Sequence, residues 1–257
     1  YDKPMIYYPL STLMMAGIRD VLIISTPRDT PSFKQLLGDG SRLGINITYA
    51  VQDEQKGIAE AFIIGEDFIG GDDVVLILGD NIFYGKLDFL RNGIANNAGA
   101  TIFGYQVQDP ERYGVVEIDG NGKVVSIEEK ASQPKSNLAI PGLYVYDSRV
   151  SAIAKTLQPS ARGELEITGI HQRYLELETL NLELLGRGVA WLDTGTPESL
   201  LDASTFIHAI EKRQGLKIGC IEEVALRRGY LTTDEFKNTV SQLPRSSYRE
   251  YCEGLVK

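Results

Sequence analysis

Two aspartates follow the same local pattern, in which a short apolar run ends in a carboxylate. Asp80 comes after residues 74–78, and Asp193 follows residues 189–192, each with a glycine-bearing loop expected beside it. In open α/β sheets, ligands bind beyond the carboxyl ends of the strands. Two carboxylates can hold one Mg²⁺ and leave positions for water and phosphate oxygens. A single strand-end aspartate is more often a loop or capping residue, but the pair favours a metal site.

A third candidate is the triplet Glu128, Glu129 and Lys130, which follows the apolar run 124–127. The ammonium group of Lys130 suits a phosphate, and the carboxylate of Glu129 can accept hydrogen bonds from sugar hydroxyls. Taken alone, a charged triplet after a strand is usually a solvated turn. The segment 162–166 precedes a helix, and its spacing fits helix capping equally well.

Several common catalytic motifs are absent from the chain. It lacks the G-x-x-x-x-G-K-[ST] loop of phosphate-binding nucleotidases and the G-x-S-x-G turn of serine hydrolases. The glycines of residues 38–44 do not match G-x-G-x-x-G and precede a strand, which argues against a dinucleotide-binding dehydrogenase. With His171 and His208 as the only histidines, a His-rich zinc or iron site is excluded. Any metal must be a hard cation held by carboxylates.

The elements that would position these residues alternate between helical and strand periodicity. Strands are expected at 21–24, 45–51, 74–78, 101–107, 138–146, 182–185 and 189–192, with a hairpin at 115–127. Helices are expected at 5–18, 33–37, 58–68, 87–97, 150–157 and 167–178, and only helices follow residue 197. This pattern predicts the α/β class with a mixed, mainly parallel sheet. We expect one domain over 1–257, with an α/β core at 1–196 and a helical C-terminal region at 197–257.

Composition and net charge indicate the class of protein, the partners that it excludes and its cellular compartment. The 257 residues are 43% hydrophobic and 24% charged, as in ordinary globular proteins, and the net charge is −9. A protein with a net negative charge has no overall electrostatic attraction for nucleic acid or an anionic membrane. No apolar run approaches the roughly 20 residues that cross a bilayer. Two cysteines and no recognisable signal peptide favour a reducing, cytoplasmic setting.

Five segments spread over the whole chain resemble the glucose-1-phosphate thymidylyltransferase family. They are YDKPMIYYPL at 1–10, LGDN at 78–81, DPERYGVV at 109–116, GELEIT at 163–168 and WLDTGT at 191–196. The resemblance implies a Rossmann-like nucleotidyltransferase fold. It also implies the reaction of dTTP with α-D-glucose 1-phosphate to give dTDP-glucose and diphosphate, the first step of dTDP-L-rhamnose synthesis.

By the same resemblance, Asp80 and Asp193 would bind Mg²⁺ and act in catalysis together with Lys130. Gln52 and Gly57 would face the thymine base. The remaining substrate-binding residues would be Gly79, Tyr113, Gly114, Glu129, Ile140 and Tyr144, alongside Asp80 and Lys130. The family works by in-line attack of the sugar phosphate on the α-phosphorus, a step that depends on positioning and charge stabilisation. A homotetramer and a second site for a feedback-inhibiting dTDP-sugar are also implied.

The chain departs from the family pattern at Gln55, Ala131, Pro141 and Gly169. Gln55 and Pro141 bear on base preference and sugar contacts, so a UTP-specific or other sugar-phosphate nucleotidyltransferase is the alternative enzyme. A non-catalytic nucleotide-sugar-binding subunit is the alternative from another class.

Apolar residues of the C-terminal helices, such as Leu200, Leu201, Phe206 and Ile210, also suggest oligomerisation. In the family, a strand and a loop with the pattern G-G-x-G-T-R-L-x-P precede the segment that matches Tyr1. That loop supplies amides and cations for the triphosphate, and no comparable glycine-rich loop lies within 1–257. We therefore expect the natural protein to be longer at its N-terminus.

Overall fold

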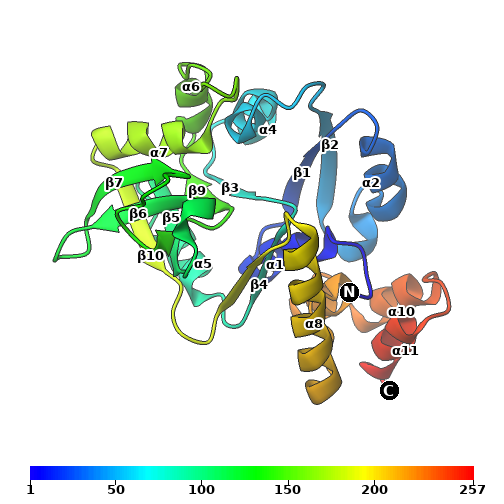
Figure 1. The fold of residues 1–257 in the computed structure, drawn as a ribbon. Coiled ribbons are helices and arrows are strands. Elements are labelled where there is room, and N and C mark those ends of the chain that lie inside the picture. Colours follow the sequence, from blue (N-terminus) through cyan, green and yellow to red (C-terminus); the bar gives the residue numbers. More distant parts are fainter.

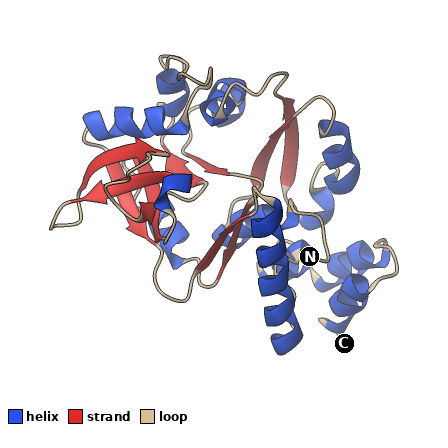
Figure 2. Cartoon of the chain, viewed as in Figure 1, coloured by secondary structure: helices blue, strands red, loops and turns tan.

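The computed structural model describes all 257 residues and combines three sheets with surrounding helices (Figures 1 and 2). The largest sheet has seven strands in the order β3-β9-β5-β8-β6-β7, with β10 beside β5. Its members are β3 (Val74–Ile77), β5 (Ala100–Gln106), β6 (Gly114–Ile118), β7 (Val124–Glu129), β8 (Leu138–Ala139), β9 (Leu143–Tyr146) and β10 (Leu180–Leu184). The α/β class predicted from the sequence is confirmed.

The prediction of a mainly parallel sheet is wrong. Only β5 with β10, and β1 (Asp20–Ser25) with β2 (Asn46–Val51), pair in parallel, whereas the other strand pairs are antiparallel. The cause is β9, which inserts between β3 and β5 and runs antiparallel to both. The chain segments that precede β3 and β5 indicate βα alternation, but strand order depends on contacts that a local pattern does not record.

A two-stranded ladder joins β4 (Asn81–Tyr84) to β11 (Ala190–Asp193). The sequence predicts a loop after Asp80, but the structure has β4 there. The two strands are antiparallel, and their register places Asp193 opposite Asn81. This pairing brings the two predicted metal-binding aspartates to one place, although they are far apart in the chain.

The helices preceding residue 197 are α1 (Tyr7–Ala16), α2 (Thr30–Leu37), α3 (Ala61–Ile64), α4 (Glu66–Ile69), α5 (Asp88–Ala95), α6 (Val150–Ala154) and α7 (Ile167–Glu176). The expected helix at 58–68 is divided into a 3-10 turn, α3 and α4, with Gly65 between the last two. The expected strand at 138–146 is interrupted at Pro141, which has no N–H to donate to a ladder. None of the helices combines the length and apolar character that a membrane span requires.

The C-terminal helices share a hydrophobic core with the N-terminal part of the chain. They are α8 (Pro197–Gln214), α9 (Ile221–Arg227), α10 (Thr233–Ser241) and α11 (Ser247–Gly254). Phe236 of α10 and Cys252 of α11 are fully buried in a cluster that also contains Met14 of α1. Thr196 caps α8 in a reciprocal capping box with Ser199. The helical region therefore packs on α1, β1 and β2 as part of the same core.

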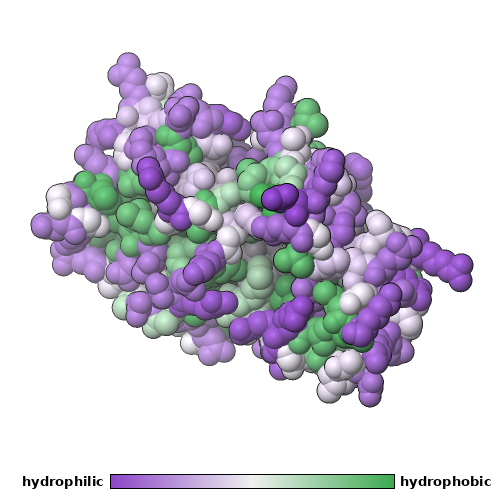
Figure 3. Space-filling view, turned by 90° about the horizontal axis from the view of Figure 1, so that it is seen from below, coloured by the Kyte–Doolittle hydropathy of each residue, from purple (hydrophilic) through white to green (hydrophobic).

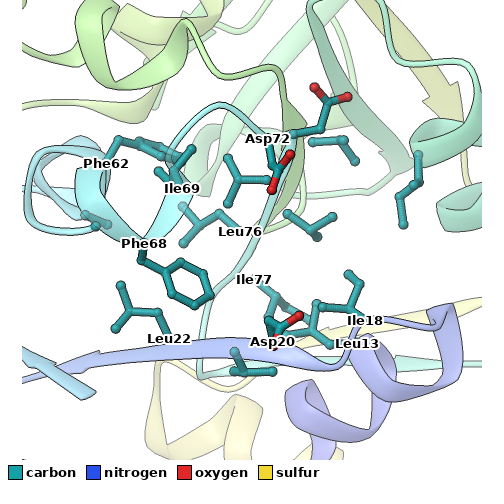
Figure 4. A pocket seen from close by; sticks show the side chains of 18 of the residues that line it. Leu13, Ile18, Asp20, Leu22, Phe62, Phe68, Ile69, Asp72, Leu76 and Ile77 are labelled. Carbon is teal, nitrogen blue, oxygen red and sulfur yellow. The ribbon is translucent and has the colours of Figure 1, made fainter. Parts of the chain in front are cut away.

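A cavity of about 740 Å³ lies between β1 and β3. Figure 4 shows its mostly apolar lining, with Leu22 of β1 facing Leu76 and Ile77 of β3, and Phe62 and Phe68 closing one side. The carboxylates of Asp20 and Asp72 also line it. β1 pairs only with β2, and β3 pairs only with β9. The facing edges of these two strands therefore have no strand partner.

Candidate functional site

A polar cavity of about 240 Å³ lies where β4, β7 and β11 meet the loops around β6 and the start of α7. Eight of the residues singled out from the sequence line it: Asp80, Tyr113, Gly114, Glu129, Lys130, Ile140, Tyr144 and Asp193. They come from segments spread over more than 100 positions. The fold thus gathers the predicted metal-binding and sugar-binding residues around one space.

The side chains of Asp80 and Asp193 face the same glycine. A Cβ atom built on Gly195 would lie 3.2 Å from Asp193 Oδ1 and 3.7 Å from Asp80 Oδ2. The Gly195 amide donates to Asp193 Oδ1 at 3.0 Å. Burial raises the pKa of Asp193, and the nearby negative charge of Asp80 raises it further. Two half-buried carboxylates that repel each other fit a divalent cation, because a cation would relieve this repulsion.

Asn81, which the sequence analysis treated only as part of a motif, holds this acidic pair in place. Its Nδ2 donates to Asp80 Oδ1 at 2.8 Å. Its Oδ1 accepts from the Gly142 amide at 2.9 Å and from the Trp191 indole Nε1 at 2.7 Å. The side chain is 3% exposed. A buried amide whose donor and acceptor sides are both used fixes its neighbours tightly.

Glu129 and Lys130 stand at the end of β7. Lys130 has a φ of 43°, in the left-handed region, and its amide donates to the Tyr113 carbonyl oxygen at 3.1 Å. A non-glycine residue in this region is strained and is often found at functional sites. Glu129 accepts a hydrogen bond from the hydroxyl of Thr168 on α7. Its β-ladder partner is Gly114, where a Cβ would lie 3.1 Å from Glu129 Oε2.

Aromatic rings form one wall of the cavity. The rings of Tyr113 and Trp191 have centroids 5.1 Å apart, and the guanidinium of Arg112 lies 5.3 Å from the Tyr113 ring centroid. Arg112 lines the cavity and adds a second cation beside Lys130. The sequence analysis gave Arg112 no role, although it belongs to the segment at 109–116. The sequence held one signal for this role, since Arg112 directly precedes Tyr113, a predicted substrate-binding residue.

The predicted base-binding residues Gln52 and Gly57 line a second cavity of about 260 Å³, together with Gly79, which was predicted to bind substrate. Ile58 and Leu78 line both cavities, so the two spaces adjoin. Gln52 Nε2 donates to Glu60 Oε2 at 2.6 Å.

Gly57 is required by close packing. Its φ is 102°, and a Cβ there would lie 2.4 Å from the carbonyl oxygen of Leu165. The neighbouring Lys56 accepts from the Leu165 amide, and Ala59 donates to the Leu165 carbonyl at 3.1 Å. The loop with Gln52 and Gly57 is therefore held against the segment that leads into α7.

Helix α7 adds two residues that the sequence analysis did not assign to the site, Thr168 and His171. They are three positions apart and therefore share one face of the helix. His171 is 1% exposed, and its Nε2 lies 2.6 Å from the Tyr146 hydroxyl. Because α7 is far from the other site residues in the chain, only its packing against β7 reveals this contribution.

This fold and site define a nucleotidyltransferase, and comparison with known proteins agrees. Residues 1–210 match the family model described as nucleotidyl transferase, and the chain belongs to this family. The chain is 54% identical to glucose-1-phosphate thymidylyltransferase from Neisseria meningitidis, over 100% of the chain and 90% of that protein. It is 55% identical to the enzyme of the same name from Mycolicibacterium smegmatis, over 100% of the chain and 89% of that protein. Within the family, it groups with the glucose-1-phosphate thymidylyltransferases.

Solved structures show the same architecture. A crystal structure of a Bacillus anthracis protein assigned as a glucose-1-phosphate thymidylyltransferase, in complex with sucrose, superposes with a TM-score of 0.73 and 41% identity. That alignment covers 79% of this chain and 82% of the other. A UDP-glucose pyrophosphorylase complexed with UDP-glucose superposes with a TM-score of 0.68 at 21% identity, over 83% of this chain and 88% of the other. The second similarity concerns the fold alone.

Proposed function

We propose that this enzyme joins dTTP and α-D-glucose 1-phosphate to form dTDP-α-D-glucose and diphosphate. The observation that supports this most directly is the cavity where Asp80, Asp193 and Lys130 meet Glu129 and Tyr113, beside a second cavity for a base. The full-length similarity to glucose-1-phosphate thymidylyltransferases supports the same reaction.

In this reaction, a phosphate oxygen of the sugar phosphate attacks the α-phosphorus of dTTP. The new P–O bond forms as the bond between the α-phosphorus and the bridging oxygen to the β-phosphate breaks, and diphosphate leaves with that electron pair. No protein nucleophile is needed, so the residues act by positioning and charge stabilisation. Lys130 and Arg112 place positive charge beside the sugar phosphate, and Glu129 accepts from sugar hydroxyls.

Asp80 and Asp193 are the residues that would hold Mg²⁺, since their oxygens converge above Gly195. When bound, the ion would neutralise charge on the phosphate oxygens and help to align them. Asn81 and the Gly195 amide orient the two carboxylates for this purpose.

The test is diphosphate release with glucose 1-phosphate and a panel of nucleoside triphosphates. We expect turnover with dTTP that exceeds turnover with UTP. Higher turnover with UTP or with a different sugar phosphate would overturn the assigned substrates. Binding of dTDP-sugars without any turnover would instead favour a non-catalytic subunit.

We propose that the chain assembles as a homotetramer in which α8 takes part in the contacts. Leu200 and Leu201 are 43% and 67% exposed on this helix, and Leu216 just after it is 52% exposed. Hydrophobic residues also show in several separate areas of the face seen in Figure 3. Light scattering should give about four times the chain mass of 28.4 kDa. A monomer mass at micromolar concentration, or no effect of Leu201→Glu on the mass, would contradict this assembly.

A third cavity, of about 590 Å³, is proposed as the place where a dTDP-sugar inhibits the enzyme. It lies between the end of β4 and α9, away from Asp80 and Asp193. Four cationic side chains line it, namely Lys86, Lys217, Arg227 and Arg228. Lys217 is paired with Asp2 and Glu211, and Arg227 with Glu223. Lys86 and Arg228 are therefore the cations that suit a diphosphate. The variant Lys86→Ala should weaken inhibition by a dTDP-sugar several-fold and leave uninhibited turnover unchanged. Equal inhibition of the wild type and the variant would argue against this site.

A further inference from the structure

The only two cysteines of the chain meet in the C-terminal helical region, beside a buried glutamate. Cys220 directly precedes α9, Glu222 lies in the first turn of α9, and Cys252 lies on α11. The two sulfurs are 3.6 Å apart, and one carboxylate oxygen of Glu222 lies within 4.8 Å of both. The three residues are 2%, 0% and 0% exposed. Two helices therefore bring three metal-ligating side chains to one closed place.

The carboxylate of Glu222 is only partly compensated by the protein around it. Its Oε2 accepts a hydrogen bond from the Tyr248 hydroxyl at 2.5 Å, but its Oε1 is buried and has no hydrogen-bond partner. Arg227, further along α9, pairs with Glu223 instead. Burial raises the pKa of Glu222. A buried carboxylate is normally paired with a cation or fully hydrogen-bonded, and Glu222 has an oxygen free for one.

The distances fit a tetrahedral Zn²⁺. Two sulfurs at ~2.3 Å from one tetrahedral ion lie about 3.8 Å from each other, close to the 3.6 Å between Cys220 and Cys252. A carboxylate oxygen on the same ion lies about 3.6 Å from each sulfur, so the Glu222 oxygen would move by no more than ~1.2 Å. Mixed thiolate and carboxylate ligands favour Zn²⁺ over Mg²⁺ and Ca²⁺, which take oxygen ligands, and over Cu⁺, which prefers sulfur.

We propose that Cys220, Glu222 and Cys252 bind one structural Zn²⁺ that ties α11 to the start of α9. Both thiols lose their protons to solvent as the metal binds, and a water molecule takes the fourth position. Two thiolates and one carboxylate outweigh the charge of the ion, and the guanidinium of Arg42, which lowers the pKa of Glu222, balances the remainder. The hydrogen bond from Tyr248 orients the ligating carboxylate.

The burial of the cluster suits a structural metal. Structural zinc sites are closed, and their ion enters as the chain folds, so no open path to the sulfurs is needed. Cys220 and Cys252 belong to the hydrophobic cluster that also contains Met14 and Phe236. The ion therefore stabilises the packing of α9 and α11 and takes no part in turnover. The expectation of a hard cation rested on the histidine count, whereas only the fold pairs these two cysteines, 32 positions apart.

The first test is to refold the full chain with Zn²⁺ and to measure the bound metal by mass spectrometry. Excess Mg²⁺ keeps the proposed metal site of Asp80 and Asp193 occupied. We expect one Zn²⁺ per chain. Zinc at about 100 times its Kd should raise Tm by roughly 5–10 °C relative to the chain refolded with a chelator. A refolded chain without zinc, or an unchanged Tm, would overturn the proposal.

Three variants test the ligands. Cys252→Ser keeps nearly the same size but removes a thiolate, and it should weaken zinc binding at least about a hundredfold, whereas Glu222→Gln should weaken it at least about tenfold. Glu223→Gln is the matched control, because it makes the same change at the next residue, outside the cluster. This control should bind zinc as the wild type does. Equal affinity of the wild type and Cys252→Ser would contradict the proposed ligands.

Cobalt substitution keeps the proposal testable if a variant does not fold. Co²⁺ bound to thiolates shows intense sulfur-to-metal charge-transfer absorption, which carboxylate sites lack. We expect this absorption in the wild-type chain refolded with Co²⁺, and its displacement by Zn²⁺. Absence of the absorption, or a disulfide between Cys220 and Cys252 in the freshly purified chain, would overturn the proposal. None of these measurements depends on turnover, so failure of the proposed reaction would leave this inference standing.

Discussion

The indole Nε1 of Trp191 donates to Oδ1 of Asn81 at 2.7 Å, and the same amide donates from its Nδ2 to Asp80 at 2.8 Å. A side chain on β11 therefore orients the carboxylate of Asp80, the residue just before β4, through one buried amide. These two hydrogen bonds connect Trp191 to Asp80 across the β4–β11 ladder, in which Trp191 is paired with Phe83.

The hydrogen bond from Trp191 to Asn81 predicts that Trp191→Phe lowers activity. The variant keeps an aromatic ring beside Tyr113 but removes the indole donor, which leaves one side of Asn81 less firmly held. Turnover should fall about tenfold, because one lost hydrogen bond to a buried amide costs ~1–3 kcal/mol. The apparent affinity for Mg²⁺ should fall as well, and excess Mg²⁺ should restore part of the activity. Unchanged Mg²⁺ dependence would show that Trp191 acts only in packing.

Replacing Asp193 by Asn should lower the turnover of the enzyme without lowering its stability. Turnover should fall at least about a hundredfold, the size of effect seen when a major electrostatic stabiliser is lost. Asp80→Asn should cause a similar loss of turnover. Full activity of both variants at limiting Mg²⁺ would show that the two aspartates are ordinary loop residues and do not bind a catalytic metal.

Without metal, Asp193→Asn should be slightly more stable than the wild type near neutral pH, by about 2 °C in Tm. The reason is that the pKa of Asp193 is raised in the fold by burial and by Asp80, so its charge opposes folding above that pKa. As pH falls through the raised pKa, the charge and the difference between the proteins should both disappear. A difference in Tm that persists at pH 3 would contradict this explanation.

Lys130→Ala should weaken glucose 1-phosphate far more than dTTP. Its ammonium lies in the cavity with Glu129 and Tyr113, whereas the predicted base-binding residues line the adjoining space. We expect the KM for glucose 1-phosphate to rise about tenfold or more, since a charge-assisted hydrogen bond contributes ~1.5–3 kcal/mol. Lys123→Ala, at the exposed tip of the β6–β7 hairpin, is the matched control and should behave as the wild type. Equal effects of Lys130→Ala on both substrates would refute the assignment.

His171 should make the fold sensitive to mild acid. Burial lowers its pKa to about 3, so the ring stays neutral in the folded state, whereas it gains a proton in the unfolded chain near pH 6.5. A depressed pKa means that stability is present above pH 6.5 and is lost as pH falls from there towards 3, by up to about 1.4 kcal/mol for each pH unit. Denaturant titrations at pH 7 and pH 5 should show a larger loss for the wild type than for His171→Asn. Equal losses would mean that other groups dominate.

The sequence by itself determined the local conformations and most of the candidate site. Periodicity located the majority of helices and strands, since apolar spacing reports which face of an element is buried. The repeated pattern of a strand ending in aspartate pointed to Asp80 and Asp193. The charged triplet after the strand at 124–127 pointed to Glu129 and Lys130, and the resemblance to a family added Tyr113. The structure places all five residues around one cavity.

The tertiary structure alone decided how these residues meet. Antiparallel pairing of β4 with β11 brings Asp193 opposite Asn81, and insertion of β9 makes the large sheet mostly antiparallel. Asn81 and His171 gained their roles only when Trp191 and Tyr146 were placed beside them. A local pattern encodes backbone conformation and burial, but hydrogen-bond partners about 110 and 25 positions apart are selected by strand order and helix packing, which no segment contains by itself.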